Sequence, residues 1–118
     1  EFTQSFRREM QAIFDKQSLA RIPPEHPIFK VDLGGYDLNS VSLRDPGVRA
    51  KDDPLKAQLR RGSPYLEGIS LGERLAVIFS PFDLSCALEN QTSPECKGYI
   101  KADAARLGAN IILFALQQ

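Results

Sequence analysis

The chain has 118 residues, of which 42% are apolar, and this is enough to build one domain around an ordinary hydrophobic core. Fifteen basic and fifteen acidic residues give a formal charge of zero, which argues against a nucleic-acid-binding protein, because that class usually carries a basic excess. The longest nearly continuous apolar run, residues 111–116, is far too short to span a bilayer, so no transmembrane segment is expected.

An amphipathic helix is expected at the start of the chain. Thr3 or Ser5 is its candidate N-cap, and the helix should end near Lys16. Apolar residues recur there at steps of three and four positions, namely Phe2, Phe6, Met10, Ile13 and Phe14. A stripe with three aromatic side chains predicts a sheet or another helix beneath it.

Irregular structure is expected over most of the next segment. Residues 21–27 contain three prolines, which remove backbone donors and favour extended geometry in the preceding residues, so a loop is predicted there. Residues 28–31 suit a brief strand. Residues 32–63 have few periodic apolar positions and predict a long, mostly irregular excursion with one short helix around 54–60.

A β-hairpin is predicted in the second half of the chain, with strands at 65–71 and 74–80 and a turn at Gly72. Because the second strand is apolar at five successive positions, we expect it to be covered on both faces, in the interior of a sheet. Glu67 and Arg74, one on each strand, are candidate binding residues.

A final helix is predicted to begin at Ser93-Pro94-Glu95, which supplies an N-cap, a proline at the first helical position and a first-turn carboxylate. Its apolar stripe consists of Ile100, Ala104, Leu107, Gly108, Ile111, Ile112 and Ala115. Glycine costs about 1 kcal/mol against alanine inside a helix, so Gly108 is expected to permit close approach to the sheet.

The polar loop at 80–86 is the first candidate for a chemical site, because α/β proteins place ligand sites at the ends of strands. In a catalytic interpretation it needs a nucleophile, an orienting carboxylate and a base. These would be Ser80, Ser85 or Cys86 as the nucleophile, Asp83 as the carboxylate and His26 as the base.

The structural alternative for this loop is simpler. Asp83 caps a short helix at 84–89, and Cys86 is a small buried residue. Asp83, Ser85 and Glu89 are also candidate binding residues. His26 has a structural alternative as well, since a histidine before a proline can hydrogen-bond its own loop.

No metal or cofactor is expected. His26 is the only histidine, Cys86 and Cys96 have no second close cysteine pair, and no phosphate-binding glycine motif occurs. Cys86 and Cys96 are equally compatible with a disulfide and with two reduced thiols, and the disulfide would allow a redox switch.

Several blocks of the sequence, in one order, resemble a bacterial family known as domain of unknown function 4159. The blocks are residues 2–10, 22–29, 66–69, 74–80, 83–86 and 103–116. The resemblance implies a class I glutamine-amidotransferase-like fold, an α/β flavodoxin-like three-layer sandwich, of which this chain is the C-terminal half, with a missing N-terminal half. Members often carry export signals, which implies a periplasmic or exported protein. Amidotransferase activity is not implied, because Cys86 lies in no strand-to-helix elbow and no late histidine follows.

The first functional hypothesis is a non-catalytic binding or assembly module. Its partner would be another protein chain or the missing N-terminal half, because an incomplete sheet leaves an edge that invites a further strand. The alternative is a hydrolase-type enzyme that uses the 80–86 loop with His26.

Overall fold

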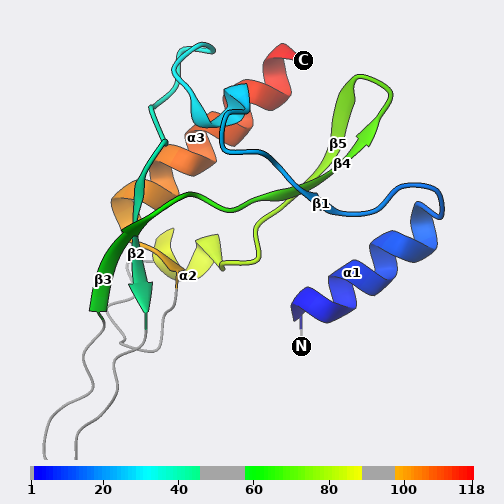
Figure 1. Cartoon of the computed structure of the whole chain (residues 1–118), viewed down its shortest axis with the longest axis horizontal. Helices are drawn as coiled ribbons and strands as arrows, with labels where there is room; N and C mark the ends of the chain where they lie inside the picture. Colours follow the sequence, from blue (N-terminus) through cyan, green and yellow to red (C-terminus); the bar gives the residue numbers. More distant parts are fainter. Residues whose placement is uncertain (1, 46–57, 89–97) are drawn as a thin grey trace, which may run out of the picture. The chain divides into compact units, whose positions relative to one another are not determined.

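A computed structural model describes residues 2–45, 58–88 and 98–118, which fall into two compact units (Figure 1). Unit 1 consists of Glu1–Pro23 and Tyr65–Pro81, and unit 2 of Pro24–Pro64 and Phe82–Gln118. Each unit is described by itself. In the described ranges, no helix combines the length and the apolar character that crossing a bilayer requires.

Unit 1 is a helix packed on a small antiparallel sheet. The helix is α1 (Phe2–Ile13), and the strands, in the spatial order β1-β4-β5, are β1 (Ala20–Arg21), β4 (Glu67–Leu71) and β5 (Arg74–Phe79). The amphipathic helix is therefore confirmed. It begins at Phe2, so Thr3 and Ser5 lie inside it rather than at its N-cap.

The apolar stripe of α1 is only partly covered. The ring of Phe6 stacks on that of Phe79 in β5, with centroids 4.5 Å apart, as expected for a sheet beneath the helix. Phe2 and Ile13, however, remain 71% and 63% exposed, and no residue of α1 is buried. The stripe is thus wider than the contact it makes within unit 1.

The predicted hairpin is confirmed, with Gly72 at a φ of +63°, a conformation that glycine adopts without strain. The interior position predicted for its second strand is wrong. The central strand is β4, whereas β5 lies at the edge, with Arg74 and Ala76 exposed. The pairing skips Ala76, since Ile69 faces Val77 and Ser70 faces Leu75, so β5 carries a bulge.

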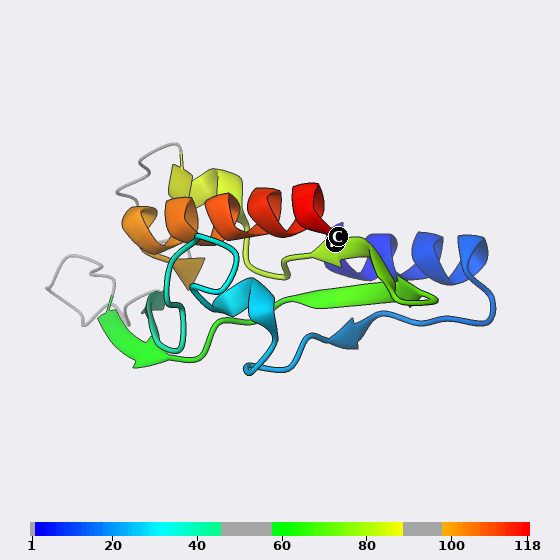
Figure 2. The same ribbon diagram turned by 90° about the horizontal axis from the view of Figure 1, so that it is seen from above.

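Unit 2 is a second antiparallel sheet with helices packed against it (Figure 2). Its strands, in the order β3-β2-β6, are β2 (Val41–Asp45), β3 (Gln58–Gly62) and β6 (Gly98–Tyr99). The long helix α3 (Lys101–Gln117) contacts β6, the short helix α2 (Leu84–Leu88) and the 3-10 helix η1 (Pro27–Phe29). The core between these elements includes Ile28, Phe29, Leu38, Val41, Tyr99 and Leu107.

The flavodoxin-like three-layer sandwich is wrong for this structure. Every described strand pair, β1 with β4, β4 with β5, β2 with β3 and β2 with β6, is antiparallel. A parallel sheet needs long crossovers between neighbouring strands, whereas β4 and β5 are joined by a tight turn. The observed architecture is a mixed α/β one, with two small three-stranded antiparallel sheets and a helix at each end.

Three local predictions are also corrected. Residues 27–29 form η1 and not a strand, because His26 caps this turn and Pro27 occupies its first position. The segment 32–63, expected to be mostly irregular, contains the antiparallel strands β2 and β3, whose pairing runs from Val41 opposite Gly62 to Asp45 opposite Gln58. Of the helix predicted at 54–60, residues 58–60 belong to β3, and residues 54–57 lie outside the described part of the chain.

The last helix begins at Lys101, directly after β6, and the predicted start at Ser93–Glu95 lies outside the described residues. Gly108 was expected to let the helix approach the sheet closely. That expectation is wrong, since a Cβ atom added at Gly108 would meet no atom within 4 Å.

A buried asparagine on α3 holds the segment that precedes β2. Asn110 accepts a hydrogen bond from the Tyr36 N–H at 2.8 Å. Its amide nitrogen donates to the carbonyl oxygens of Ile28 and Tyr36, each at 2.9 Å. Gly35 fits closely against this amide, because a Cβ atom there would lie 2.9 Å from the Asn110 Cγ atom. Residues far apart in sequence are thereby joined in unit 2.

Candidate functional site

Asp83 caps helix α2, as the structural alternative for the polar loop requires. Its Oδ1 atom accepts hydrogen bonds from the Ser85 N–H at 2.9 Å, the Ser85 hydroxyl at 2.6 Å and the Cys86 N–H at 3.3 Å. The hydroxyl bond from Ser85 is the main reason that the pKa of Asp83 lies below its ordinary value. This arrangement stabilises the first turn of a short helix.

Two of the predicted residues near this loop, Glu89 and Cys96, lie outside the described residues. A disulfide between Cys86 and Cys96 therefore stays one of two alternatives, beside a pair of reduced thiols. Cys86 itself is half-buried on α2, which is more open than the buried position expected for it. Ser80 is also half-buried and belongs to unit 1, whereas Asp83, Ser85 and His26 belong to unit 2.

His26 forms the local hydrogen bond expected from its position before a proline. Its Nδ1 atom accepts from the Ile28 N–H at 3.1 Å, so that nitrogen carries no proton and serves as the N-cap of η1. Its ring packs edge-on against Phe114 of α3, with centroids 5.2 Å apart. Burial lowers the pKa of His26, which favours the neutral ring. No hydrogen bond joins it to Ser85 in the described structure, where both residues bond to near neighbours.

Glu67 lies at the centre of a polar cluster in unit 1. It is only 5% exposed, on the central strand β4. Arg7 of α1 donates to its Oε2 atom at 2.6 Å, and the Tyr65 hydroxyl donates to the same atom at 3.0 Å. The Arg21 guanidinium lies 4.8 Å from the centre of the Tyr65 ring. The cluster therefore ties α1 to the sheet through a buried carboxylate.

The electrostatics of this cluster suit a structural tie. Burial, and then the hydrogen bond to Glu67, raise the pKa of Tyr65, so the phenol keeps its proton at neutral pH. Arg7 also lines a shallow pocket of about 190 Å³ with Gln11, Ser18 and Leu19. Because Glu67 offsets the charge of Arg7, this pocket does not stand out as an anion site.

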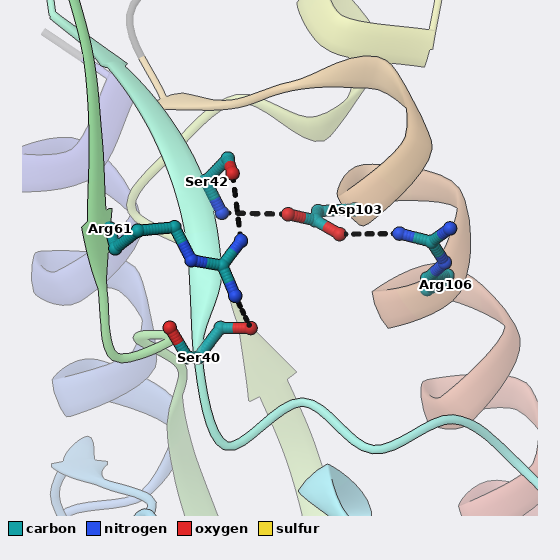
Figure 3. Close-up of polar contacts among 5 residues, drawn as sticks. All are labelled: Ser40, Ser42, Arg61, Asp103 and Arg106. Carbon is teal, nitrogen blue, oxygen red and sulfur yellow. Dashed lines mark hydrogen bonds and ion pairs between the residues drawn. The ribbon is translucent and has the colours of Figure 1, made fainter.

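A second polar cluster ties α3 to sheet β3-β2-β6 (Figure 3). Asp103 is 4% exposed and accepts from the Ser42 N–H at 2.7 Å and from Arg106 at 2.8 Å. Arg61 of β3 donates to the Ser42 hydroxyl at 2.8 Å and to the Ser40 carbonyl at 3.2 Å. These contacts hold the first turn of α3 on strand β2.

Sequence reasoning missed Arg7, Tyr65 and Asp103 as members of these clusters. Two signals were present. Tyr65 and Glu67 are two residues apart in an extended segment, so they share a face. Asp103 and Arg106 are three apart on a helix, which places them side by side. Neither spacing identifies the distant partner, Arg7 in one case and Ser42 in the other.

Strand β5 forms one edge of the sheet of unit 1, and we call its side that faces away from β4 the open side. In the described ranges β5 pairs with another strand along one side only, through β4. Arg74, a predicted binding residue, is exposed at its start, and the residues after it are uncharged up to Phe79. An edge of this kind presents backbone donors and acceptors to a further strand.

The described ranges contain no group of three His, Cys, Asp or Glu side chains that could hold a metal ion. Comparison of the chain with curated proteins and with solved structures gives no significant match. A family model, in contrast, matches residues 1–116, which is almost the full length given. The chain therefore belongs to the family described as Domain of unknown function (DUF4159).

Proposed function

We propose that the chain is a non-catalytic binding or assembly module, and that its partner adds an extended segment along the open side of β5. The partner is another protein chain or a further segment of the same protein. The observation that carries this proposal is the position of β5, an apolar strand at the edge of its sheet.

The chemistry of the edge defines what binds there. Backbone N–H and C=O groups along a strand edge are satisfied best by another extended backbone, which forms a hydrogen-bonded ladder. Val77, Ile78 and Phe79 follow the bulge at Ala76 without a charge or a proline. Natural edge strands usually carry a charged residue or a proline, which prevents pairing with a further strand. The uninterrupted ladder therefore begins at Val77.

The local roles of the candidate catalytic residues also favour a binding module. His26 accepts a hydrogen bond from its own turn, and Asp83 accepts those of the first turn of α2. Each geometry is accounted for by helix capping. Among the described residues, no contact favours the hydrolase alternative.

The test uses native material. The tagged chain is isolated from its source cells without denaturation, and amide hydrogen exchange in residues 76–79 is compared with that of the chain purified alone. We expect slower exchange at alternate β5 amides in the native material, because a strand ladder protects them. Equal exchange rates in the two samples would overturn the proposal, whatever proteins co-purify.

A matched pair of variants locates the effect. Ala76→Lys places a charge on the exposed edge strand, whereas Ser70→Lys places one at an exposed position of the central strand β4. We expect Ala76→Lys to abolish the protection at β5 and Ser70→Lys to leave it intact. Equal loss in both variants would contradict strand addition at this edge.

A further inference from the structure

The outward side of helix α3 is apolar, although it packs on nothing in the described structure that would bury it. Ile112 and Leu116 are 61% and 78% exposed. They lie on the side of the helix opposite Asp103, Leu107 and Asn110, which are buried. Between residue 107 and the end of the given sequence there is no charged residue. The outward side is therefore more apolar than a solvated helix face requires.

These exposed residues follow the spacing of a helix–helix contact. Steps of three, four, three and four residues connect the positions Ala102, Ala105, Ala109, Ile112 and Leu116. Ala102 and Ala105 are exposed, and Ala109 is half-buried. A repeat of three and four is the pattern with which one helix packs along another at a small crossing angle. We call these five positions the outer seam of α3.

We infer that the outer seam of α3 binds the same seam of a second copy of this chain, with the two helices antiparallel. The sizes of the side chains carry this inference. The seam has small side chains at its start and large ones at its end. An antiparallel pair centred on Ala109 places Leu116 level with Ala102, and Ile112 within one residue of Ala105. A parallel pair instead places large residues on large ones and leaves gaps between the alanines.

Charge agrees with the antiparallel arrangement. In the antiparallel pair Lys101, at the first position of α3, lies beside the last described turn of the other copy. No residue of the last turn of α3 carries a positive charge that would oppose it. In a parallel pair the two Lys101 side chains lie together and repel each other. The seam is thus self-complementary in both size and charge.

The length of the seam limits the strength of the association. From Ala102 to Leu116 the helix rises about 21 Å, and its width with side chains is roughly 10–12 Å. A contact of those dimensions lies below the roughly 1,200 Å² that stable complexes bury. The dimer is accordingly expected to be weak and to dissociate on dilution. This association uses unit 2 and is separate from strand addition at β5.

Sedimentation equilibrium over about 10 μM to 1 mM tests the inference in the concentration range in which weak complexes associate. We expect the weight-average mass to rise from 13.1 kDa toward that of a dimer. Ile112→Lys should raise the dissociation constant at least about tenfold. Val31→Lys is the matched control, because Val31 is a similarly exposed apolar residue of unit 2, 58% exposed, outside α3. A constant monomer mass, or an equal effect of both variants, would overturn the inference.

Cysteine substitutions test the orientation. In the antiparallel pair the two Ala109 positions face each other, so Ala109→Cys should form a disulfide-linked dimer under mild oxidation. The two Leu116 positions lie at opposite ends, so Leu116→Cys should not. The unsubstituted chain, treated identically, controls for Cys86 and Cys96. Linkage of Leu116→Cys as efficient as that of Ala109→Cys would contradict the antiparallel arrangement.

Discussion

Replacing two glycines of unit 2 by alanine tests the packing around α3 with the smallest possible change. Gly35 and Gly108 both gain one methyl group, and both lie in the same compact unit. At Gly108 the new Cβ atom meets nothing within 4 Å, whereas at Gly35 it lies 2.9 Å from the Asn110 Cγ atom and 3.4 Å from the Leu113 Cδ1 atom. The same substitution should therefore change stability in opposite directions.

The magnitudes follow from the two environments. Alanine is more favourable than glycine inside a helix by about 0.8–1 kcal/mol, so Gly108→Ala should stabilise the protein by that amount. Gly35→Ala displaces the Asn110 amide from its bonds to Ile28 and Tyr36. Each buried polar group left without a partner costs about 1–3 kcal/mol, so a loss of roughly 2 kcal/mol or more is expected. The two variants should then differ by about 3 kcal/mol.

Urea unfolding, followed by circular dichroism at a few micromolar protein, measures both free energies of unfolding. A Gly35→Ala variant as stable as the parent chain would refute the tight contact between Gly35 and Asn110. A destabilised Gly108→Ala variant would mean that a neighbour occupies the space beside Gly108. That second result would also count against an open outward side of α3.

Three further predictions concern the polar residues. Arg7→Ala should lower the free energy of unfolding by about 1–3 kcal/mol, because it leaves the buried Glu67 carboxylate without its cation, and adding Glu67→Gln should recover part of the loss in a double-mutant cycle. Burial lowers the pKa of His26, so the stability that its neutral ring contributes is complete above its ordinary pKa of about 6.5 and is lost as the pH falls through the lower pKa of the folded state. His26→Asn, which keeps an acceptor for the cap, should remove this pH dependence of the free energy of unfolding, and an unchanged pH profile would contradict the reasoning. Asp83→Ala should lower the free energy of unfolding by about 1 kcal/mol, because the cap of α2 is lost. Asp83→Asn should keep most of the cap and remove only the stability that the parent chain loses as the pH falls below about 4, and equal losses of stability in the two variants at neutral pH would point to a role of the charge itself.

The features of this fold that the sequence predicts well depend on neighbouring residues. Helix α1 follows from a stripe at steps of three and four, and the β4–β5 hairpin from a glycine turn between two apolar runs. The cap formed by Asp83 needs only the three residues that follow it. Such signals lie within one turn or one hairpin, so a single sequence contains all the information they require.

Long-range pairing could not be predicted in this way. Strand β2 pairs with β3 and with the two-residue strand β6. Apolar and polar residues alternate in β2 only from Val41 to Arg44 and do not alternate in β3, so the sequence pattern does not identify the partner of either strand. The resemblance implied parallel strands, but direction depends on which strands meet, and the connections observed here join antiparallel neighbours. His26 illustrates the same limit at the candidate site, because both a base and a cap suit its sequence, and only its bond to Ile28 distinguishes them.

Part of each surface proposed to bind other chains was expected from the sequence to be buried, namely β5 and, in the outer seam, Ile112. Strand β5 was expected to be covered on both faces, and Gly108 was expected to bring α3 onto a sheet. Both expectations follow from apolar residues in the sequence, but the described units do not bury all of these residues. Strand β5 lies at the edge of its sheet, and Ile112 and Leu116 are exposed. Removing apolar surface from water is favourable in proportion to its area, so binding of a further chain that covers these surfaces would be favoured by the hydrophobic effect. The apolar character that the described units leave exposed at β5 and α3 is therefore the reason why we propose both as places where partners bind.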